Sequence, residues 1–356
     1  MSGGPKTVPA SQRVAKPLLR ALGGERVAPP PIWLMRQAGR YLAEYRAMRT
    51  QAGSFMALCL DPALAAEVTL QPIRRFEFDA AILFSDILMV PHGLGQRVGF
   101  ADGIGPQLDA LADGGALSRL SLAPLTTRLA PVYRAIELVR RELPETVALI
   151  GFAGAPWTVA SYMIEGGPSE DYAKAKAWMT RDAEAFERLI ALLVEATTMH
   201  LCAQAAAGAE ALQLFDSWAG ALAEPERRRW CLAPAAEIVA RVKRRFPEVR
   251  IILFPRGAGS LYRDYAAVPG VDALSLDSTV ELDWARDELQ GKVALQGNLD
   301  PKLLVAGGSA MRAAVARILD RLADGRFVFN LGHGILPETP VAHVAALVAQ
   351  VRAHRR

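Results

Sequence analysis

The sequence predicts a single α/β domain, a (β/α)8 or TIM barrel, and three observations support this fold class. Short apolar runs alternate with longer amphipathic segments along the 356 residues. The runs are apolar throughout, which is typical of parallel strands buried on both faces. There are eight of them, and this repeated strand–helix pattern favours a closed barrel. In chain order, the predicted strands are Ile32–Met35, Ala80–Phe84, Val147–Phe152, Ala211–Phe215, Arg250–Phe254, Ala273–Leu276, Val293–Leu295 and Phe327–Leu331.

Helical patterns lie between these strands. The longest is rich in Ala and Leu, which are strong helix formers. Thr339 followed by Pro340 is typical of an N-cap with proline at the first helical position. The predicted helices are Ala130–Glu142, Asp182–Ala207, Pro234–Phe246, Ser309–Ala323 and Pro340–His354.

A doubly wound parallel sheet is the alternative fold. Its usual dinucleotide-binding form needs a G-x-G-x-x-G motif after a strand, and no predicted strand is followed by one. We interpret Gly103-Ile104-Gly105, a fragment of that motif in a polar loop, as a turn. We therefore divide the chain into a flexible N-terminal arm, residues 1–16, and one barrel domain, residues 17–356.

Composition narrows the possible partners. The chain is 51% hydrophobic and 22% charged, which excludes a disordered protein. Its net charge is only +4, without a concentrated basic arm, so we expect no nucleic-acid partner. Cys59, Cys202 and Cys231 are too few and too widely spaced for a disulfide framework, which indicates a reducing compartment such as the cytoplasm. No apolar run approaches the ~18 residues of a membrane span, so no membrane partner is expected.

Polar residues follow nearly every predicted strand. In a (β/α)8 barrel the carboxyl ends of the strands meet at one face, where catalytic groups collect. We therefore expect these side chains to lie close together. In order along the chain they are Arg36, Gln37, Arg40, Asp86, Tyr162, Asp216, Ser217, Arg256, Asp277, Asn298 and His333.

Each candidate also has a structural interpretation. Arg36 follows an apolar run, and a buried arginine needs a partner or an acidic ligand, although most arginines are solvated. Asp86 is costly to bury without hydrogen-bond donors, unless it caps a helix. Tyr162 is also compatible with the core, and Ser217 with a simple turn. His333 lies between two glycines, which allow the backbone to approach a ligand closely.

A zinc site is the main metal hypothesis. His200-Leu201-Cys202 forms an H-x-C pair, with Cys231 further along. The pair lies inside the longest predicted helix, where residues two apart point to different faces. We therefore predict no metal site. His92, His343 and His354, like His200, are interpreted as surface or helix residues.

Several motifs in the chain resemble those of the uroporphyrinogen decarboxylase family, in the family's order from about Pro17 to the C-terminus. Residues 31–41, PIWLMRQAGRY, resemble the first signature of that family. Residues 151–158, GFAGAPWT, continuing to YMIEG at 162–166, resemble the second. The further matches are FSDIL at 84–88, FDSWAG at 215–220, QGNLDP at 296–301 and NLGHG at 330–334.

The resemblance implies a single (β/α)8 barrel that usually forms a homodimer with two facing clefts. It implies decarboxylation of the four acetate arms of uroporphyrinogen III to methyl groups, giving coproporphyrinogen III, with no metal and no organic cofactor. The functional positions carried over are Arg36, Arg40, Asp86, Tyr162, Ser217 and His333, and we add Gln37 as a substrate-binding candidate.

The chain departs from the family pattern at three positions. Ala43 replaces a common Pro, Ser278 a common Trp, and Arg256 a frequent Lys. These changes affect loop packing and substrate fit, but they remove none of the proposed catalytic groups.

The predicted mechanism assigns Asp86 and Arg36 to catalysis. Ionised Asp86 would stabilise a transient cation on the pyrrole. Arg36 and Arg40 would bind the carboxylates of the substrate, and Arg256 would add to the positive electrostatic field. The proton donor is open: Arg36 holds that role in proposals for the family, but a guanidinium is a poor acid, and a water or substrate carboxyl held by it is the alternative.

Two other functions remain compatible with the sequence. One is a corrinoid or thiol methyltransferase on a related barrel, which would need a zinc site. The other is a non-catalytic tetrapyrrole-binding protein, which could dispense with Asp86.

Overall fold

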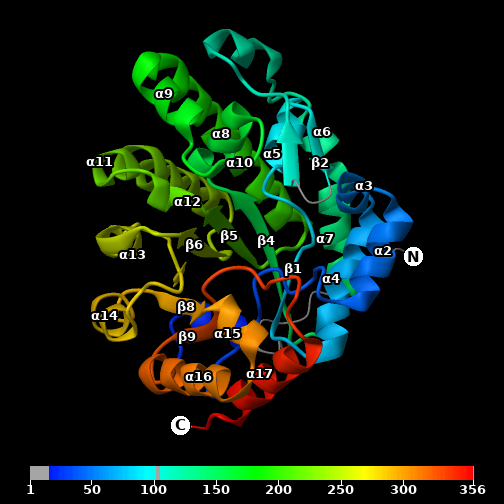
Figure 1. Cartoon of the computed structure of the whole chain (residues 1–356), viewed down its shortest axis with the longest axis vertical. Coiled ribbons are helices and arrows are strands. Elements are labelled where there is room, and N and C mark those ends of the chain that lie inside the picture. The colour runs from blue at the N-terminus through cyan, green and yellow to red at the C-terminus, as the bar shows by residue number, and fades with distance from the viewer. Residues whose placement is uncertain (1–15, 102–104, 356) are drawn as a thin grey trace, which may run out of the picture.

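The structure, a computed structural model, describes residues 16–101 and 105–355. Seven parallel strands form a curled sheet at its centre, with helices around them (Figure 1). Sequential strands are neighbours, in the order β1-β4-β5-β6-β7-β8-β9. The strands are β1 (Ala80–Ile82), β4 (Ala148–Gly154), β5 (Ala211–Asp216), β6 (Arg250–Pro255), β7 (Ala273–Ser275), β8 (Ala294–Leu299) and β9 (Phe327–Leu331).

The Ile32 segment occupies the eighth position and closes the barrel. Ile32 forms a parallel bridge with Phe329 of β9. On its other side, the Asp79 N–H, just before β1, donates to the Ile32 carbonyl at 3.0 Å. The predicted strand Ile32–Met35 is reduced to this bridge because the Met35 N–H donates to the Asn330 side chain instead of a strand carbonyl. The predicted (β/α)8 barrel is thus confirmed, with one position shorter than expected.

The predicted helices are present with small shifts at their ends. Asp182 is an N-cap whose carboxylate accepts the Ala185 N–H, so that helix begins one residue later than predicted. Thr339 is not the N-cap that we predicted: Pro340, which has no N–H, takes the extended conformation of that position and the helix starts at Val341.

The helices of the described chain are α1 (Pro17–Leu22), α2 (Ala43–Ala52), α3 (Phe55–Leu60), α4 (Pro62–Phe76), α5 (Met89–Leu94), α6 (Leu125–Arg128), α7 (Ala130–Glu142), α8 (Pro156–Glu165), α9 (Ala173–Arg181), α10 (Ala183–Ala207), α11 (Glu224–Arg227), α12 (Ala233–Arg245), α13 (Tyr262–Ala266), α14 (Leu282–Glu288), α15 (Pro301–Ala306), α16 (Gly308–Leu322) and α17 (Val341–Ala353). An antiparallel hairpin of β2 (Val98–Ala101) and β3 (Gly105–Leu108) was not predicted. In the predicted turn at 103–105, Gly103 and Ile104 lie outside the described residues.

The amino end of the barrel is closed by packing. Leu18, Ala21 and Leu22 of α1 belong to the same buried cluster as the inward side chains of the strands. Above this plug, the indole N–H of Trp33 donates to Gln296 at 2.8 Å inside the barrel. These contacts leave the carboxyl end of the strands as the face for a functional site.

Three carboxylates tie neighbouring strands together at the amino end. Asp79, Glu210 and Asp272 each directly precede a strand. Each accepts the N–H near the start of the neighbouring strand, from Ile32, Leu149 and Ile251 respectively. Each is also neutralised by a cation, namely Arg352, Lys16 and Lys243.

Lys16 marks the beginning of the described chain. Its side chain is buried and its Nζ donates to Glu210 at 2.6 Å and to the Val147 carbonyl at 2.8 Å. Lys16 is therefore part of the barrel and not of the arm in which we placed it, because the carboxylate that it neutralises is contributed by a distant strand. The rest of the predicted arm, residues 1–15, lies outside the described residues.

Two features concern the outer helices. Helix α10 is long and apolar enough to span a membrane, unlike our expectation that no apolar run would reach that length. However, 61% of its most apolar window is buried within the fold, as for a core helix.

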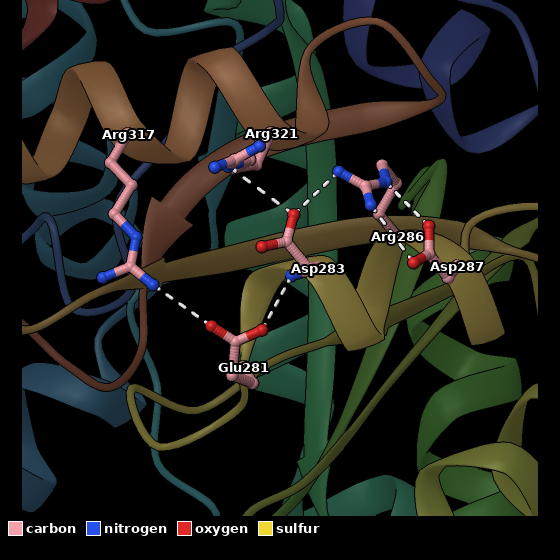
Figure 2. A network of polar contacts seen from close by, with 6 residues as sticks. All are labelled: Glu281, Asp283, Arg286, Asp287, Arg317 and Arg321. Carbon is pink, nitrogen blue, oxygen red and sulfur yellow. Dashed lines mark hydrogen bonds and ion pairs between the residues drawn. The ribbon is translucent and has the colours of Figure 1, made fainter.

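Figure 2 shows how charged side chains join α14 to α16, including Asp283 with Arg321 and Glu281 with Arg317. Such exposed pairs contribute little to stability individually.

Candidate functional site

Four of the predicted site residues interact electrostatically at the carboxyl end of the barrel. Burial raises the pKa of Asp86, and the Arg36 charge opposes that rise; burial lowers the pKa of His333, and the Arg36 charge adds to that fall. Burial also raises the pKa of Tyr162, with a contribution from the Asp86 carboxylate. Arg36 comes from the closing segment, Asp86 from the loop after β1, and His333 from the loop after β9, which are adjacent positions of the barrel. The structure therefore brings together residues that are up to 297 positions apart in the sequence.

Contacts with the described residues occupy only one of the two carboxylate oxygens of Asp86. It is half-buried, and its Oδ1 accepts the Leu88 N–H at 2.8 Å. Helix α5 begins only at Met89 with Leu88 as its N-cap, so Asp86 is not a helix cap. Its Oδ2 makes no hydrogen bond within the described part of the chain. Burial raises the pKa of Asp86 to about 6, against the Leu88 N–H and the Arg36 charge, so the carboxylate is mostly ionised at neutral pH.

The backbone directs Arg36 into the mouth of the barrel. Arg36 has a left-handed conformation, with φ of 62°, and an exposed side chain. Its neighbour Met35 is held on both sides: the Met35 N–H donates to Asn330 at 2.9 Å, and the Met35 carbonyl accepts the Ile335 N–H at 2.9 Å. These bonds hold the unfavourable conformation in place.

The glycines beside His333 make room for protein groups. A Cβ on Gly334 would lie 2.4 Å from Cδ of Arg36, and a Cβ on Gly332 would lie 2.2 Å from Oγ of Ser278. We had expected them to admit a ligand. Instead, the Arg36 side chain and the loop after β7 pack directly against this turn.

Gln37 is a correction to the predicted site. Its side chain is fully buried, where we predicted contact with substrate. Its Oε1 accepts the Leu34 N–H at 3.0 Å and its Nε2 donates to the Ala80 carbonyl at 2.9 Å. Both polar ends are therefore occupied, and Gln37 fixes the turn that carries Arg36 to the start of β1.

Arg40 and Ser217 are the other two residues carried over from the family resemblance. Arg40 is exposed. Ser217 is half-buried directly after β5, and its hydroxyl makes no hydrogen bond within residues 16–101 and 105–355. The ring of Tyr162, on α8, lies 6.1 Å from that of Trp218, so Tyr162 and the Ser217 loop are neighbours.

Three strand-end residues are structural. The buried Asp216 carboxylate accepts the Thr158 hydroxyl at 2.6 Å. That of Asp277 accepts the Gly257 N–H at 2.8 Å. Asn298 donates to the Asp277 carbonyl at 3.1 Å. They hold the loops after β5, β6 and β7 in position.

Sequence reasoning missed an arc of aromatic rings at the mouth. Phe152, Phe215 and Phe254 lie near the carboxyl ends of β4, β5 and β6. Successive ring centroids are 5.5 and 6.0 Å apart, and Phe254 lies 6.2 Å from His333. A usable signal was that all three end predicted strands. Burial and nearby guanidiniums lower the pKa of His333 to about 3, so its imidazole is neutral at neutral pH.

The sequence pair considered for zinc does not form a ligand set. His200 Nδ1 lies 3.1 Å from the Tyr133 hydroxyl, and burial lowers the pKa of His200 to about 3. Within the described residues there is no group of three or more His, Cys, Asp and Glu side chains suited to a metal. Cys59, Cys202 and Cys231 are all buried and free.

The family model and the curated relatives that match this chain indicate the same family. The family model for uroporphyrinogen decarboxylase (URO-D) matches residues 14–354. A uroporphyrinogen decarboxylase from Rhodospirillum rubrum is 52% identical over 343 residues, which cover 96% of this chain and 99% of the relative. One from Chelativorans sp. is 53% identical, covering 95% and 98%. Among solved structures, a methyltransferase from Methanosarcina mazei has a TM-score of 0.77 at 21% identity, covering 94% and 96%, which shows a shared fold.

Proposed function

This chain belongs to the uroporphyrinogen decarboxylase family, and on that premise we propose how the side chains at its barrel mouth carry out the reaction. The protein is a carboxy-lyase that decarboxylates uroporphyrinogen in porphyrin biosynthesis. In the finer proposal, it converts the four acetate arms of uroporphyrinogen III to methyl groups and releases coproporphyrinogen III.

Loss of CO2 from an acetate arm leaves an electron pair that needs a sink, which enzymes often borrow from a cofactor. A pyrrole can supply its own. A proton added to the α-carbon next to the ring carbon that bears the acetate makes the ring cationic. Cleavage of the bond to CO2 then neutralises the ring and leaves an exocyclic double bond. A second proton, added to the exocyclic carbon, completes the methyl group, and the α-carbon loses the first proton to restore the pyrrole. We therefore propose that no organic cofactor or metal takes part.

Asp86 is the group that stabilises the cationic ring. Its Oδ2 is free to accept hydrogen bonds from pyrrole N–H groups. A fixed carboxylate among buried groups stabilises developing positive charge more strongly than water does. The observation that carries the proposal is this half-buried, mostly ionised carboxylate in the field of Arg36.

The guanidiniums bind the acidic arms. Neither Arg36 nor Arg40 forms an ion pair within the described residues. Each guanidinium is therefore available to bind a substrate carboxylate through two parallel N–H groups. We propose that Arg36 also takes part in catalysis by holding the water or substrate carboxyl that delivers the proton, since a guanidinium is itself a poor acid. Tyr162, Ser217 and neutral His333 then hydrogen-bond the remaining arms.

The test is incubation with uroporphyrinogen under anaerobic, reducing conditions, with chromatography of the oxidised products. Replacing Asp86 by Asn removes the charge at nearly constant shape, and kcat should fall by about 100-fold or more, while Asp86→Glu should retain more activity. For the wild-type enzyme, kcat/KM should fall as the pH drops below about 6, where the Asp86 carboxylate becomes protonated. Near-full turnover by the Asn variant would rule out the charge-stabilising role.

The same assay separates an enzyme from a tetrapyrrole-binding protein, which would bind the substrate and leave it unchanged. We further propose that the protein is a cytoplasmic homodimer without nucleic-acid or membrane partners. The net charge of only +4 and the three buried free cysteines support this environment. Light scattering of the purified protein tests the dimer: a monomeric mass would contradict it.

A further inference from the structure

Arg256 is a half-buried arginine without a partner. It follows β6 directly, and its guanidinium makes neither an ion pair nor a hydrogen bond within the described residues. The other arginines of the described chain that lack both are exposed to solvent. Withdrawing a guanidinium from water without a counter-charge is costly. An acidic ligand would supply that counter-charge.

The backbone around Arg256 is anchored on three sides. Its N–H donates to the Asp216 carbonyl at 3.1 Å, and its carbonyl accepts the Gly220 N–H at 2.9 Å. The next N–H, of Gly257, donates to the Asp277 carboxylate at 2.8 Å. Gly257 has a φ of 73°, and a Cβ there would lie 3.0 Å from Cα of Gly220. The loops after β5, β6 and β7 thus hold Arg256 in place before any ligand binds.

The barrel order places Arg256 across the mouth from Arg36. Counting from the Ile32 segment, β6 is the fourth position in either direction around the barrel. Burial lowers the pKa of His333, and the positive charges of Arg36 and Arg256 each lower it further, so both guanidiniums act on this side chain. The two guanidiniums therefore face the same mouth from opposite sides.

We propose that Arg256 is a further carboxylate-binding residue of the site, and that it holds a propionate arm of the substrate on the side opposite Arg36. This inference rests on the proposed function. A macrocycle that carries eight carboxylates presents arms on every side. The four decarboxylations remove the acetates in turn, whereas the propionates persist. A fixed cation that serves all four steps must therefore bind a propionate.

The test compares Arg256→Ala with the wild type. The KM for uroporphyrinogen should rise about 10- to 100-fold, as expected for the loss of a charge-assisted hydrogen bond, with kcat changed by less than about threefold. Coproporphyrinogen retains only the propionates, so its inhibition constant should rise by the same factor. Arg256→Lys keeps the charge but loses the paired N–H donors of the guanidinium, so its KM should lie between those of the wild type and Arg256→Ala. The melting temperature should not decrease, because the side chain has no partner in the protein.

Arg141→Ala is the matched control. Arg141 is an exposed arginine on α7 without an ion pair or hydrogen bond in the described chain, so its loss changes the net charge equally and should leave KM unchanged. An unchanged KM for Arg256→Ala would overturn the inference. An increased KM with unchanged inhibition by coproporphyrinogen would overturn the choice of propionate, and a lower melting temperature would indicate a structural role. Anaerobic calorimetric titration with coproporphyrinogen needs no turnover, so it tests Arg256 even if the wild type shows no decarboxylation and the proposed function fails.

Discussion

Substitution of Gly334 by Ala tests how the protein positions Arg36. The added Cβ would lie 2.4 Å from Cδ, 2.8 Å from Cγ and 2.9 Å from Nε of Arg36, whereas ordinary contacts begin at 3.4 Å. The Cδ must therefore move by at least about 1 Å. Gly334 does not have a positive φ, so alanine is compatible with the backbone there. The exposed Arg36 side chain should move in preference to the core.

A displacement of about 1 Å in a positioning group can cost about 100-fold in rate, which corresponds to about 2.7 kcal/mol of transition-state stabilisation. We expect kcat/KM for uroporphyrinogen to fall by this order, with less than about 1 kcal/mol lost in the free energy of unfolding. Gly291→Ala is the control, because an added Cβ there meets nothing within 4 Å. In an Arg36→Ala background the obstructed atoms are absent, so Gly334→Ala should have almost no further effect. An equal loss in that background would refute the reasoning.

Two further predictions concern stability. Burial lowers the pKa of His200 to about 3 in the folded state, against about 6.5 when unfolded, so the unfolded chain takes up the proton first and stability falls as the pH drops below about 6.5. Between pH 7 and 5 this amounts to about 2 kcal/mol. Urea unfolding at pH 7 and pH 5 measures how much the free energy of unfolding decreases between them. That decrease should be about 2 kcal/mol smaller in His200→Asn than in the wild type, and an equal decrease would contradict the prediction. Replacing Asp272 by Ala leaves the cations of Lys243 and Arg250 unpaired, which should cost about 3–5 kcal/mol in the free energy of unfolding. Because Asp272 lies at the amino end of the barrel, kcat should be unchanged, and a loss of kcat in still-folded protein would show that the two ends are coupled.

The architecture and most of the site follow from local patterns. Each predicted strand is a continuous apolar run, and a polar residue follows it at the carboxyl end, where the parallel strands of the barrel end together. That alignment is a property of the fold class, so Asp86, Arg36, Tyr162 and His333 could be assigned to one face from the sequence. The electrostatic interactions between them agree with this assignment.

Other assignments depended on partners distant in the sequence. Gln37 belongs to the same motif as Arg36, yet its side chain is fully occupied by backbone groups, one of them 43 residues away. Gly332 and Gly334, beside His333, leave space that Ser278 and Arg36 occupy. These partners are far away in the sequence, so no local spacing pattern could have indicated them. Lys16 belongs to the barrel because its ammonium group pairs with the carboxylate of Glu210, which lies 194 residues later in the sequence.

The sequence by itself therefore determined the eight barrel positions, their order and the polar residues at their ends, because periodicity and chain order carry that information. It did not indicate the β2–β3 hairpin. Only the tertiary structure decided which of those residues remain free for a ligand. Asp216, Asp277 and Asn298 are buried and engaged by neighbouring loops, although Oδ2 of Asp216 has no partner within the described residues. Asp86 and Arg256 are only half-buried and keep polar groups without partners in the described chain. The physical reason is that burial and hydrogen-bond satisfaction are set by contacts between distant segments, which a local pattern does not encode.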